Sequence, residues 1–434
     1  MALGISISRA FFMLDFSIFQ YIHQTIEAFM KFKTFSLLLL FLTFANKLTT
    51  QAQKLLIKQK VEVLGSLARE PMFAEHPSGA LFVTGYHNAV TIPQLWKSID
   101  KGKNWSKVNV GTKAEGAHGN SDADLVIDPD GVIYLLSMKY TEFSVKESRV
   151  TDRGHIAVGV SKNAGETWQW KYISKNNFDD RPWIEITPDK TAHIIWNDGK
   201  GVHYVVSRDQ GKTWQKRPDI YPKGGSSHFA AGPQGQLAVR VTPGSASGFR
   251  FEKGVDLLRL SLDFGKTWSD VHLPGKRKWN KSIFRGTPRW VEPIAWDAQG
   301  HLYYLWSERK KLKLARSANN GQTWKTWQID HNPRLIYFPF LTISNNQAAC
   351  TWVTGYRKKL RHEAAVVDLS KQKPTIYRLP PQVLEIYTDD GRLGLGGEYF
   401  PLKRLKNGDY GMVTPIQNGK NKRVGFVWWR LRME

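Results

Sequence analysis

Short apolar runs recur along the chain, and each follows a turn rich in Gly, Pro, Asn or Asp. A turn followed by an apolar run is typical of the first hairpin of an antiparallel sheet. Seven such turns occur, at 76–79, 128–131, 187–190, 232–235, 297–300, 344–347 and 405–408. Their mean period of roughly 55 residues suits a four-stranded blade. The pattern therefore predicts an all-β propeller of seven blades of four antiparallel strands, with six blades as the alternative.

A second pattern, S-x-D-x-G-x-T-W, repeats with small variations at 98–105, 161–168, 207–214, 261–268 and 317–324. Repeats at such spacings are typical of propellers. We expect the acid to accept hydrogen bonds from its own turn, the Gly to supply a positive φ, and the Trp to pack between sheets. Asn163 and Asn319 replace the acid, which a turn tolerates and catalysis would not. We therefore interpret these acids as structural.

The two ends of the repeat region complement each other. The segment 55–64 is a lone predicted strand before the first blade, and the final unit, about 398–432, holds only three strands. Pairing them would close the ring and remove exposed sheet edges. No helix or second domain is evident in the pattern, so we expect 53–434 to be a single propeller domain.

The N-terminal region has a different pattern. An apolar stretch at 34–45 follows the basic segment 30–33 and leads into small residues near Ala52. This order predicts a secretory signal peptide over 30–52, and hence a secreted, periplasmic or cell-surface protein. Residues 1–29 lack this order of basic, apolar and small residues, and we interpret them as an extension of the gene model. The mature chain has no run of roughly 20 apolar residues, so we expect no integral membrane segment.

Charge narrows the choice of partner. The chain carries 62 Lys and Arg against 38 Asp and Glu, a formal charge of +24. Such an excess attracts polyanions. Because export is expected, we favour an anionic glycan or oligosaccharide over nucleic acid, against the alternative of a basic surface with no specific use. Cys350 is the only cysteine, so no intramolecular disulfide is possible, and because it lies in an apolar run we expect it to be buried. We expect the protein to be a monomer.

Polar residues stand where the inner strand of each blade begins. Charged or aromatic groups occupy most of these positions: Arg69-Glu70-Pro71, Asp122-Ala123-Asp124, Asp180-Arg181-Pro182-Trp183, Ser226-Ser227-His228, Trp290-Val291-Glu292-Pro293, Tyr337-Phe338-Pro339 and Glu398-Tyr399-Phe400-Pro401. Polar groups that converge at a channel mouth are a default site hypothesis. The alternative is that they cap strand ends and pair with one another.

The repeated boxes, with D-R-P-W-I at 180–184 and G-E-Y-F-P-L at 397–402, resemble the sialidase (BNR repeat) superfamily, in particular a group of secreted bacterial sialidase-like proteins. The resemblance covers essentially the whole mature chain. It implies an exo-sialidase-like glycoside hydrolase without a cofactor. Family members bind the sugar carboxylate with three arginines, attack with a tyrosine activated by a glutamate, and use an aspartate as acid/base. Tyrosine is an exception to the usual pair of carboxylates.

Several positions match that scheme. Tyr399 is similar to the family nucleophile, and the activating base falls on Glu398 or Glu292. The acid falls on Asp124 or Asp180. The resemblance assigns substrate binding to Arg69, Arg240 and Arg309. The polar strand starts add four further candidates for substrate binding: Glu70, Arg181, His228 and Glu292.

The sequence also departs from the family pattern. No acid lies between Pro77 and Ser98, residues 85–88 replace an expected arginine, and 226–228 replace the expected glutamate. Two other functions therefore stay open. One is a polysaccharide lyase on uronates, with His228 and Tyr399 as base and acid. The other is a non-catalytic propeller that binds glycan or protein. The twelve histidines show no metal-ligand spacing, so we predict no metal.

Overall fold

The structure is a computed structural model with two compact units, Met1–Gln53 and Lys54–Glu434. It describes residues 21, 23–25, 27, 30 and 53–434, the latter without 68, 88–89, 199, 223, 243–256, 275–290, 309, 333–334, 357–358, 388–396 and 419–422. In the first unit, residues 21, 23–25, 27 and 30 are helical and Gln53 is not. No helix among the described residues is both long and apolar enough to cross a bilayer. The predicted signal peptide and the predicted extension fall almost entirely outside the described residues.

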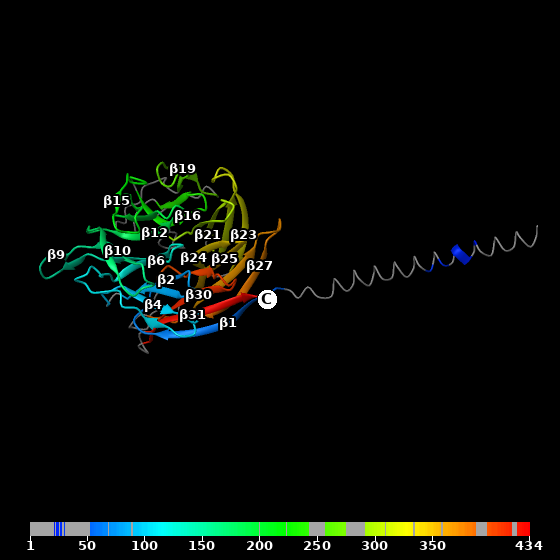
Figure 1. Ribbon diagram of the computed structural model, residues 1–434, viewed down its shortest axis with the longest axis horizontal. Helices are drawn as coiled ribbons and strands as arrows, with labels where there is room; N and C mark the ends of the chain where they lie inside the picture. The colour runs from blue at the N-terminus through cyan, green and yellow to red at the C-terminus, as the bar shows by residue number, and fades with distance from the viewer. Residues whose placement is uncertain are drawn as a thin grey trace, which may run out of the picture. The chain divides into compact units, whose positions relative to one another are not determined.

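Among its described residues, the second unit contains six four-stranded antiparallel sheets, a seventh sheet of five strands and one two-stranded hairpin, and this arrangement of seven blades confirms the predicted propeller (Figure 1). Blades 1 to 3 contain β2 (Arg69–Glu75), β3 (Leu81–Tyr86), β4 (Gln94–Ser98) and β5 (Ser106–Lys107); β6 (Ser121–Ile127), β7 (Ile133–Lys139), β10 (His155–Ser161) and β11 (Gln169–Ser174); and β12 (Asp180–Ile186), β13 (Ala192–Asn197), β14 (Val202–Ser207) and β15 (Gln215–Lys216). A hairpin of β8 (Glu142–Ser144) and β9 (Arg149–Asp152) is inserted in blade 2.

Blades 4 to 7 continue the same order around the ring. They contain β16 (Gly225–Ala231), β17 (Leu237–Thr242), β18 (Leu257–Ser261) and β19 (Ser269–His272); β20 (Ile294–Trp296), β21 (Leu302–Glu308), β22 (Lys311–Ser317) and β23 (Lys325–His331); β24 (Leu335–Ser344), β25 (Gln347–Tyr356), β26 (Lys359–Asp368) and β27 (Thr375–Val383); and β29 (Leu402–Arg404), β30 (Tyr410–Asn418), β31 (Arg423–Met433) and β1 (Leu55–Leu64), with β28 (Ile386–Tyr387) parallel to the end of β30.

The N-terminal strand closes the ring. β1 pairs antiparallel with β31 from Leu55 opposite Met433 to Leu64 opposite Gly425. Figure 1 shows this blue strand beside the red C-terminal strand. The predicted closure is confirmed, and it gives blade 7 its fourth strand. Closure covers an edge of β31 that would otherwise be available for pairing with another chain.

The repeated boxes form the predicted turns. In the first box, the Ser98 hydroxyl donates to Asp100 at 2.9 Å and accepts from the Gly102 backbone N–H at 2.8 Å. Gly102 has φ +85°, a conformation that L side chains rarely adopt. The box Trp packs on the preceding blade, as the 5.4 Å between the ring centres of Trp105 and Trp428 illustrates. The boxes therefore join neighbouring blades.

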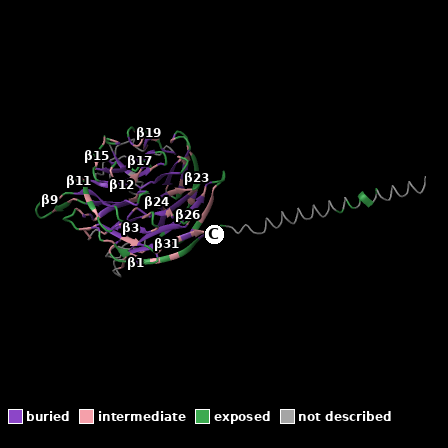
Figure 2. Ribbon diagram, viewed as in Figure 1, coloured by how far each residue is buried: buried purple, intermediate pink, exposed green. Residues whose placement is uncertain are grey.

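The core lies between the blades and around the channel. Figure 2 shows buried residues throughout the sheets and exposed residues in the hairpins. The described inner strands contact each other in ring order from β2 through β6, β12, β16, β20 and β24 to β29. Cys350 is buried in β25, and burial raises the pKa of its thiol. The seven inner strands thus enclose one channel, whose two ends hold the groups considered next.

Candidate functional site

Five inner strands contain a β-bulge near their first residues. The register shifts between Arg69 and Met72, Ser121 and Ala123, Asp180 and Trp183, Ser226 and His228, and Tyr337 and Phe340. A bulge inserts an extra residue and redirects a side chain, and bulges are common beside active sites. The same irregularity therefore recurs at the channel mouth, on the end of the strands opposite the Asp-box turns.

Three bulge residues carry backbone strain. Glu70, Arg181 and Phe338 have φ values of +48°, +50° and +47°, and each precedes a proline. Positive φ is uncommon for residues with a side chain, and a following proline disfavours helical conformations further. Such strain persists only where the surrounding structure imposes it, and it clusters at functional sites. Two of the three strained residues are charged and belong to the candidate site.

These two charged residues meet the segment that precedes β29. Arg181 donates from Nη2 to Oε2 of Glu398 at 2.8 Å. The backbone N–H of Glu398 donates to Oε1 of Glu70 at 3.1 Å. Gly397 permits this approach, because a Cβ there would lie 2.2 Å from Cγ of Glu70. Blades 1, 3 and 7 are therefore joined at the mouth by charged side chains.

Tyr399 faces a carboxylate from blade 2. Its hydroxyl donates to Oδ2 of Asp122 at 3.4 Å, and the Ser121 hydroxyl donates to Oδ1 of the same group at 3.0 Å. Tyr399 and Asp122 are 2% and 7% exposed. A hydroxyl beside a buried carboxylate is the arrangement of a nucleophile and its base. We call Glu70, Asp122, Asp180, Arg181, Glu398 and Tyr399 the mouth cluster.

Burial controls the protonation of the mouth cluster. It raises the pKa of Glu70 well above its ordinary value; the charges of Asp122 and Glu398 add to the rise, and Arg181 opposes it. Burial also raises the pKa of Tyr399, with Asp122 and Glu70 as the next causes. Tyr399 is therefore a neutral phenol, and Glu70 is a carboxyl group that retains its proton to higher pH than usual. Buried groups whose pKa values are shifted in this way are typical of catalytic sites.

Other predicted residues at the strand starts also join the mouth cluster. Asp180 is buried, with Oδ2 4.0 Å from Nε of Arg181. Arg69 is half-buried, and its charge opposes the rise in the pKa of Glu70. Two tyrosines that sequence reasoning missed lie nearby. Burial, followed by the charge of Glu70, raises the pKa of buried Tyr86, which occupies the 85–88 segment noted above. The charge of Asp122 is the main cause of the raised pKa of Tyr140.

Asp124, one of the two candidates for the acid, lies elsewhere. Its Oδ1 accepts from the Leu125 N–H at 2.8 Å, and its Oδ2 accepts from the Ile184 N–H at 3.0 Å. It therefore joins blades 2 and 3, and Asp122 takes the place beside Tyr399. The bulge at Asp122 is the reason, because it breaks the strict alternation by which strand positions are assigned to faces.

Arg240 and Glu292 pair with each other between blades 4 and 5. Nη2 of Arg240 donates to Oε2 of Glu292 at 2.8 Å, and the Tyr304 hydroxyl donates to the same oxygen. Arg240 is fully buried. This pairing differs from the predicted role of Arg240 in substrate binding and that of Glu292 as base. Arg309 lies outside the described residues.

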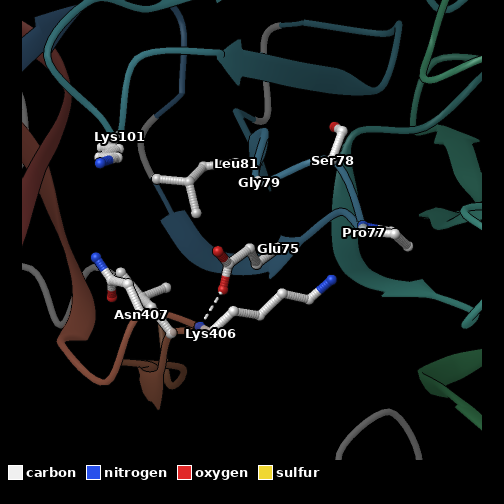
Figure 3. A pocket seen from close by; sticks show the side chains of 9 residues that line it. Glu75, Pro77, Ser78, Gly79, Leu81, Lys101, Lys406 and Asn407 are labelled. Carbon is white, nitrogen blue, oxygen red and sulfur yellow. Dashed lines mark hydrogen bonds between the residues drawn. The ribbon is translucent and has the colours of Figure 1, made fainter.

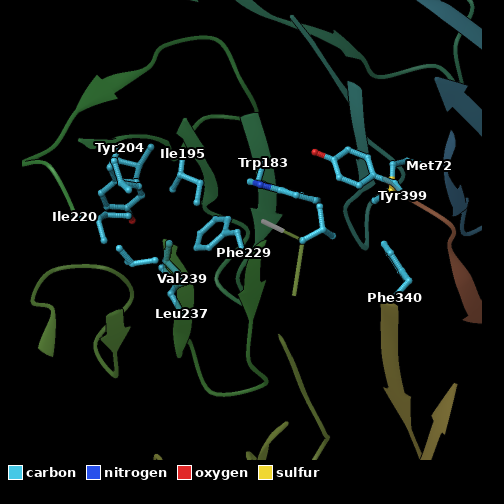
Figure 4. Close-up of a cluster of buried hydrophobic side chains, with 14 residues drawn as sticks. Met72, Trp183, Ile195, Tyr204, Ile220, Phe229, Leu237, Val239, Phe340 and Tyr399 are labelled. Carbon is cyan, nitrogen blue, oxygen red and sulfur yellow. The ribbon is translucent and has the colours of Figure 1, made fainter. Parts of the chain in front are cut away.

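An aromatic layer crosses the channel below the mouth cluster. The Trp183 ring centre is 4.9 Å from the rings of both Tyr399 and His228. Met72 and Phe340 belong to the same buried cluster, and Figure 4 shows them with Trp183 and Tyr399. His228 and Tyr399, the candidate base and acid of a lyase, therefore pack on one ring.

Beyond this layer, towards the Asp-box turns, a cavity of about 210 Å³ occupies the channel. Each inner strand contributes to its lining, for example Met72, Asp124, Glu185, Ala230, Ala295, Thr342 and Lys403. Sequence reasoning missed Glu185 and Lys403 because it considered only strand starts. Their signal is the two-residue alternation along the strand, which places Glu185 on the same side as Trp183.

A further cavity, of about 340 Å³, lies on the turn side where the ring closes (Figure 3). The backbone N–H of Lys406 donates there to Oε2 of Glu75 at 2.7 Å. Lys101 of the first Asp-box also lines it. This cavity belongs to the joint between blades 7 and 1. Across the described part of the chain, no group of three His, Cys, Asp or Glu side chains is placed to hold a metal ion.

Comparisons with known proteins agree with the fold. The BNR/Asp-box repeat family matches residues 205–216, which contain the third box. No curated protein sequence matches the chain. Among solved structures, the chain is similar to a PL25 ulvan lyase, described as a polysaccharide lyase, with TM-score 0.51 and 10% identity over 86% of this chain and 95% of that chain.

Two further solved structures are similar at lower scores. One is YCF48 from Cyanidioschyzon merolae, with TM-score 0.48 and 10% identity over 85% of this chain and 98% of that chain. The other is the NanB sialidase from Streptococcus pneumoniae, with TM-score 0.41 and 12% identity over 87% and 70%. The family match confirms the predicted repeat, and the ulvan lyase likeness shows the propeller fold alone, since one fold hosts many functions.

Proposed function

We propose that this propeller, which carries the BNR/Asp-box repeats of the sialidase-like superfamily, is an exported glycoside hydrolase that cleaves anionic glycans at its channel mouth. The observation that carries the proposal is the contact between the Tyr399 hydroxyl and Asp122 inside a buried charged cluster. Burying several charges is costly unless they are paired. Such a cluster at a channel mouth is therefore a candidate for chemistry.

In the proposed reaction, Tyr399 attacks the anomeric carbon and Asp122 accepts the phenol proton in the same step. A neutral phenol needs such a base, because burial keeps it from ionising on its own. Glu70 gives its proton to the leaving oxygen as the glycosidic C–O bond breaks, for which a raised pKa is suited. Water then attacks the anomeric carbon and breaks its bond to the Tyr399 oxygen, while Glu70 takes a proton from this water and Asp122 returns the phenol proton to Tyr399. Arg181 and Arg69 supply positive charge to an anionic sugar, and Glu398 orients Arg181.

The enzyme assay uses a fluorogenic sialoside, with a uronate-lyase absorbance assay run in parallel. Tyr399→Phe should reduce hydrolysis by about 10³-fold or more, since removing a nucleophile abolishes the covalent route. Tyr410→Phe is the matched control, because it removes a buried hydroxyl that donates to Gln347 at 2.6 Å, away from the mouth cluster. It should leave turnover unchanged.

Other outcomes would redirect the proposal. Equal turnover by the wild type and Tyr399→Phe would remove the nucleophile role. Formation of an unsaturated uronate product would favour the lyase. Glycan-array binding without turnover of either substrate would favour a binding propeller.

A further inference from the structure

The channel cavity beyond the aromatic layer has the size of a small molecule. Its volume of about 210 Å³ equals that of about seven water molecules at ~30 Å³ each. Trp183, Phe229 and Phe340 are among its lining residues. It lies on the opposite side of Trp183 from the charged groups of the mouth. It is therefore a compartment with its own lining.

Several polar groups without a hydrogen-bond partner line this compartment. Within the described part of the chain, the Lys403 ammonium makes no hydrogen bond or ion pair and lies 5.5 Å from the centre of the Phe73 ring. The indole nitrogens of Trp183 and Trp296 and Nδ1 of His228 are buried, and they too lack a hydrogen-bond partner among the described residues. Buried polar groups without partners are rare in native proteins.

The two acids of the compartment add little acceptor capacity near neutral pH. The Asp124 carboxylate already accepts two backbone N–H groups. Burial, reinforced by the charge of Asp124 and opposed by that of Lys403, raises the pKa of Glu185 to about 8. Glu185 accepts a hydrogen bond from the Ala231 backbone N–H and keeps its proton to higher pH than usual, so its O–H can donate to a ligand. A ligand rich in oxygen acceptors would match this lining.

We propose that the compartment is a second binding site, which takes one small oxygen-rich carboxylate, namely a single acidic monosaccharide. Lys403 of blade 7 binds the carboxylate, and Glu185 of blade 3, on the far side of the ring, donates to it or to a hydroxyl. The sugar ring packs on Trp183, and its remaining oxygens accept from the unpartnered indole N–H groups. Sugar rings suit such surfaces because they combine apolar faces with polar edges.

The choice of a sugar acid, rather than another small carboxylate, rests on the proposed function. The requirement that the ligand carry a negative charge does not rest on the proposed function. Burial lowers the pKa of Lys403, whereas Asp124 and Glu185 raise it. A bound carboxylate adds a negative charge beside Lys403 and favours its ammonium form.

Calorimetric titration of the Asp122→Asn protein with D-glucuronate tests the site without turnover. D-Glucose is the neutral control and should bind at least about tenfold more weakly, because a charge-assisted hydrogen bond is lost. Lys403→Met should weaken glucuronate binding at least about tenfold, and Lys403→Arg should restore part of it. Lys406→Met is the matched control, since Lys406 lines the separate cavity between blades 7 and 1, where its Nζ donates to the His76 carbonyl at 3.3 Å.

A pH series gives a second readout that does not depend on the folding of Lys403→Met. Glu185 faces Asp124 and Lys403, and His228 lines the same compartment. Ionised Glu185 repels the bound carboxylate, so affinity should fall about tenfold per pH unit above about 8. Glu185→Gln should remove this component of the pH dependence and leave only the loss of affinity caused by deprotonation of Lys403.

Equal glucuronate affinity in the parent and Lys403→Met proteins, or a pH profile unchanged by Glu185→Gln, would overturn the site. Glucuronate binding to a wild-type protein that hydrolyses no glycan would reject the proposed function and leave this site intact. Hydrolysis without glucuronate binding would do the reverse.

Discussion

Asp100 in the first Asp-box and Glu70 at the channel mouth carry the same functional group in opposite surroundings. Asp100 accepts hydrogen bonds from the backbone N–H groups of Lys103 and Asn104 at 3.0 and 2.9 Å. The backbone and side chain of Asn104 are the main reasons that its pKa falls to about 2. Glu70 is 6% exposed, and burial raises its pKa.

The two regions also differ in repetition. The box contacts recur in five blades, with Asn163 and Asn319 making the same turn hydrogen bonds as an acid would. The charges of the mouth cluster come only from blades 1, 2, 3 and the lead into blade 7. The repeated Asp-box turns stabilise the ring, whereas the mouth cluster, which does not repeat, is where a chemical function is proposed. Three experiments test this difference between the Asp-boxes and the mouth cluster.

The largest effect is expected from the same Asp→Asn change made in both regions. Asp122→Asn should reduce kcat by about 10²–10⁴-fold, because it removes the proposed general base while keeping its shape. Asp209→Asn, in the third box, should leave kcat unchanged, since Asn occupies two other boxes. Steady-state hydrolysis of the fluorogenic sialoside measures both. An equal loss in the two variants would contradict the division of roles.

A glycine pair tests how closely the mouth cluster is packed. Gly397→Ala places a Cβ 2.2 Å from Cγ of Glu70, at φ +94°. Gly79→Ala has a similar φ of +86° and meets nothing within 4 Å. Both variants should lose stability through backbone strain of about 1 kcal/mol. Gly397→Ala should lose about 1–3 kcal/mol more through overpacking. Urea denaturation measures the difference, and equal losses would show that Glu70 moves without penalty.

The smallest effect is a difference in pH dependence. Because the folded pKa of Asp100 is lowered, its stabilising contribution is present above its unfolded value of 3.8 and disappears as pH falls through about 2. Glu70 has a raised folded pKa, so its contribution is present at low pH and disappears as pH rises through that pKa. The free energy of unfolding of Asp100→Asn should therefore be lower than that of the wild type at pH 5, and this difference should disappear as pH falls through about 2. Glu70→Gln should gain stability relative to wild type as pH rises. If the stability of both variants relative to wild type changed in the same direction with pH, the difference between the two regions would be contradicted.

The sequence by itself determined the number of blades, the five box turns and the closing strand. These features depend on local interactions: a turn needs its Gly and its acid within eight residues, and a strand is recognised by its own apolar run. Segment 55–64 was predicted as a strand with the same bounds that β1 has. The strand starts of the mouth cluster were predicted for the same reason, since each precedes a recognisable turn.

The identity of the groups that meet was decided only by the tertiary structure. Whether Asp122 or Asp124 faces Tyr399 depends on a bulge that shifts the register by one residue. Glu292 turned towards Arg240, a partner 52 residues away along the chain. Lys403 and Glu185 share a cavity only because the ring closes. Side-chain direction across blades is set by packing between distant segments, so a local sequence pattern cannot predict it.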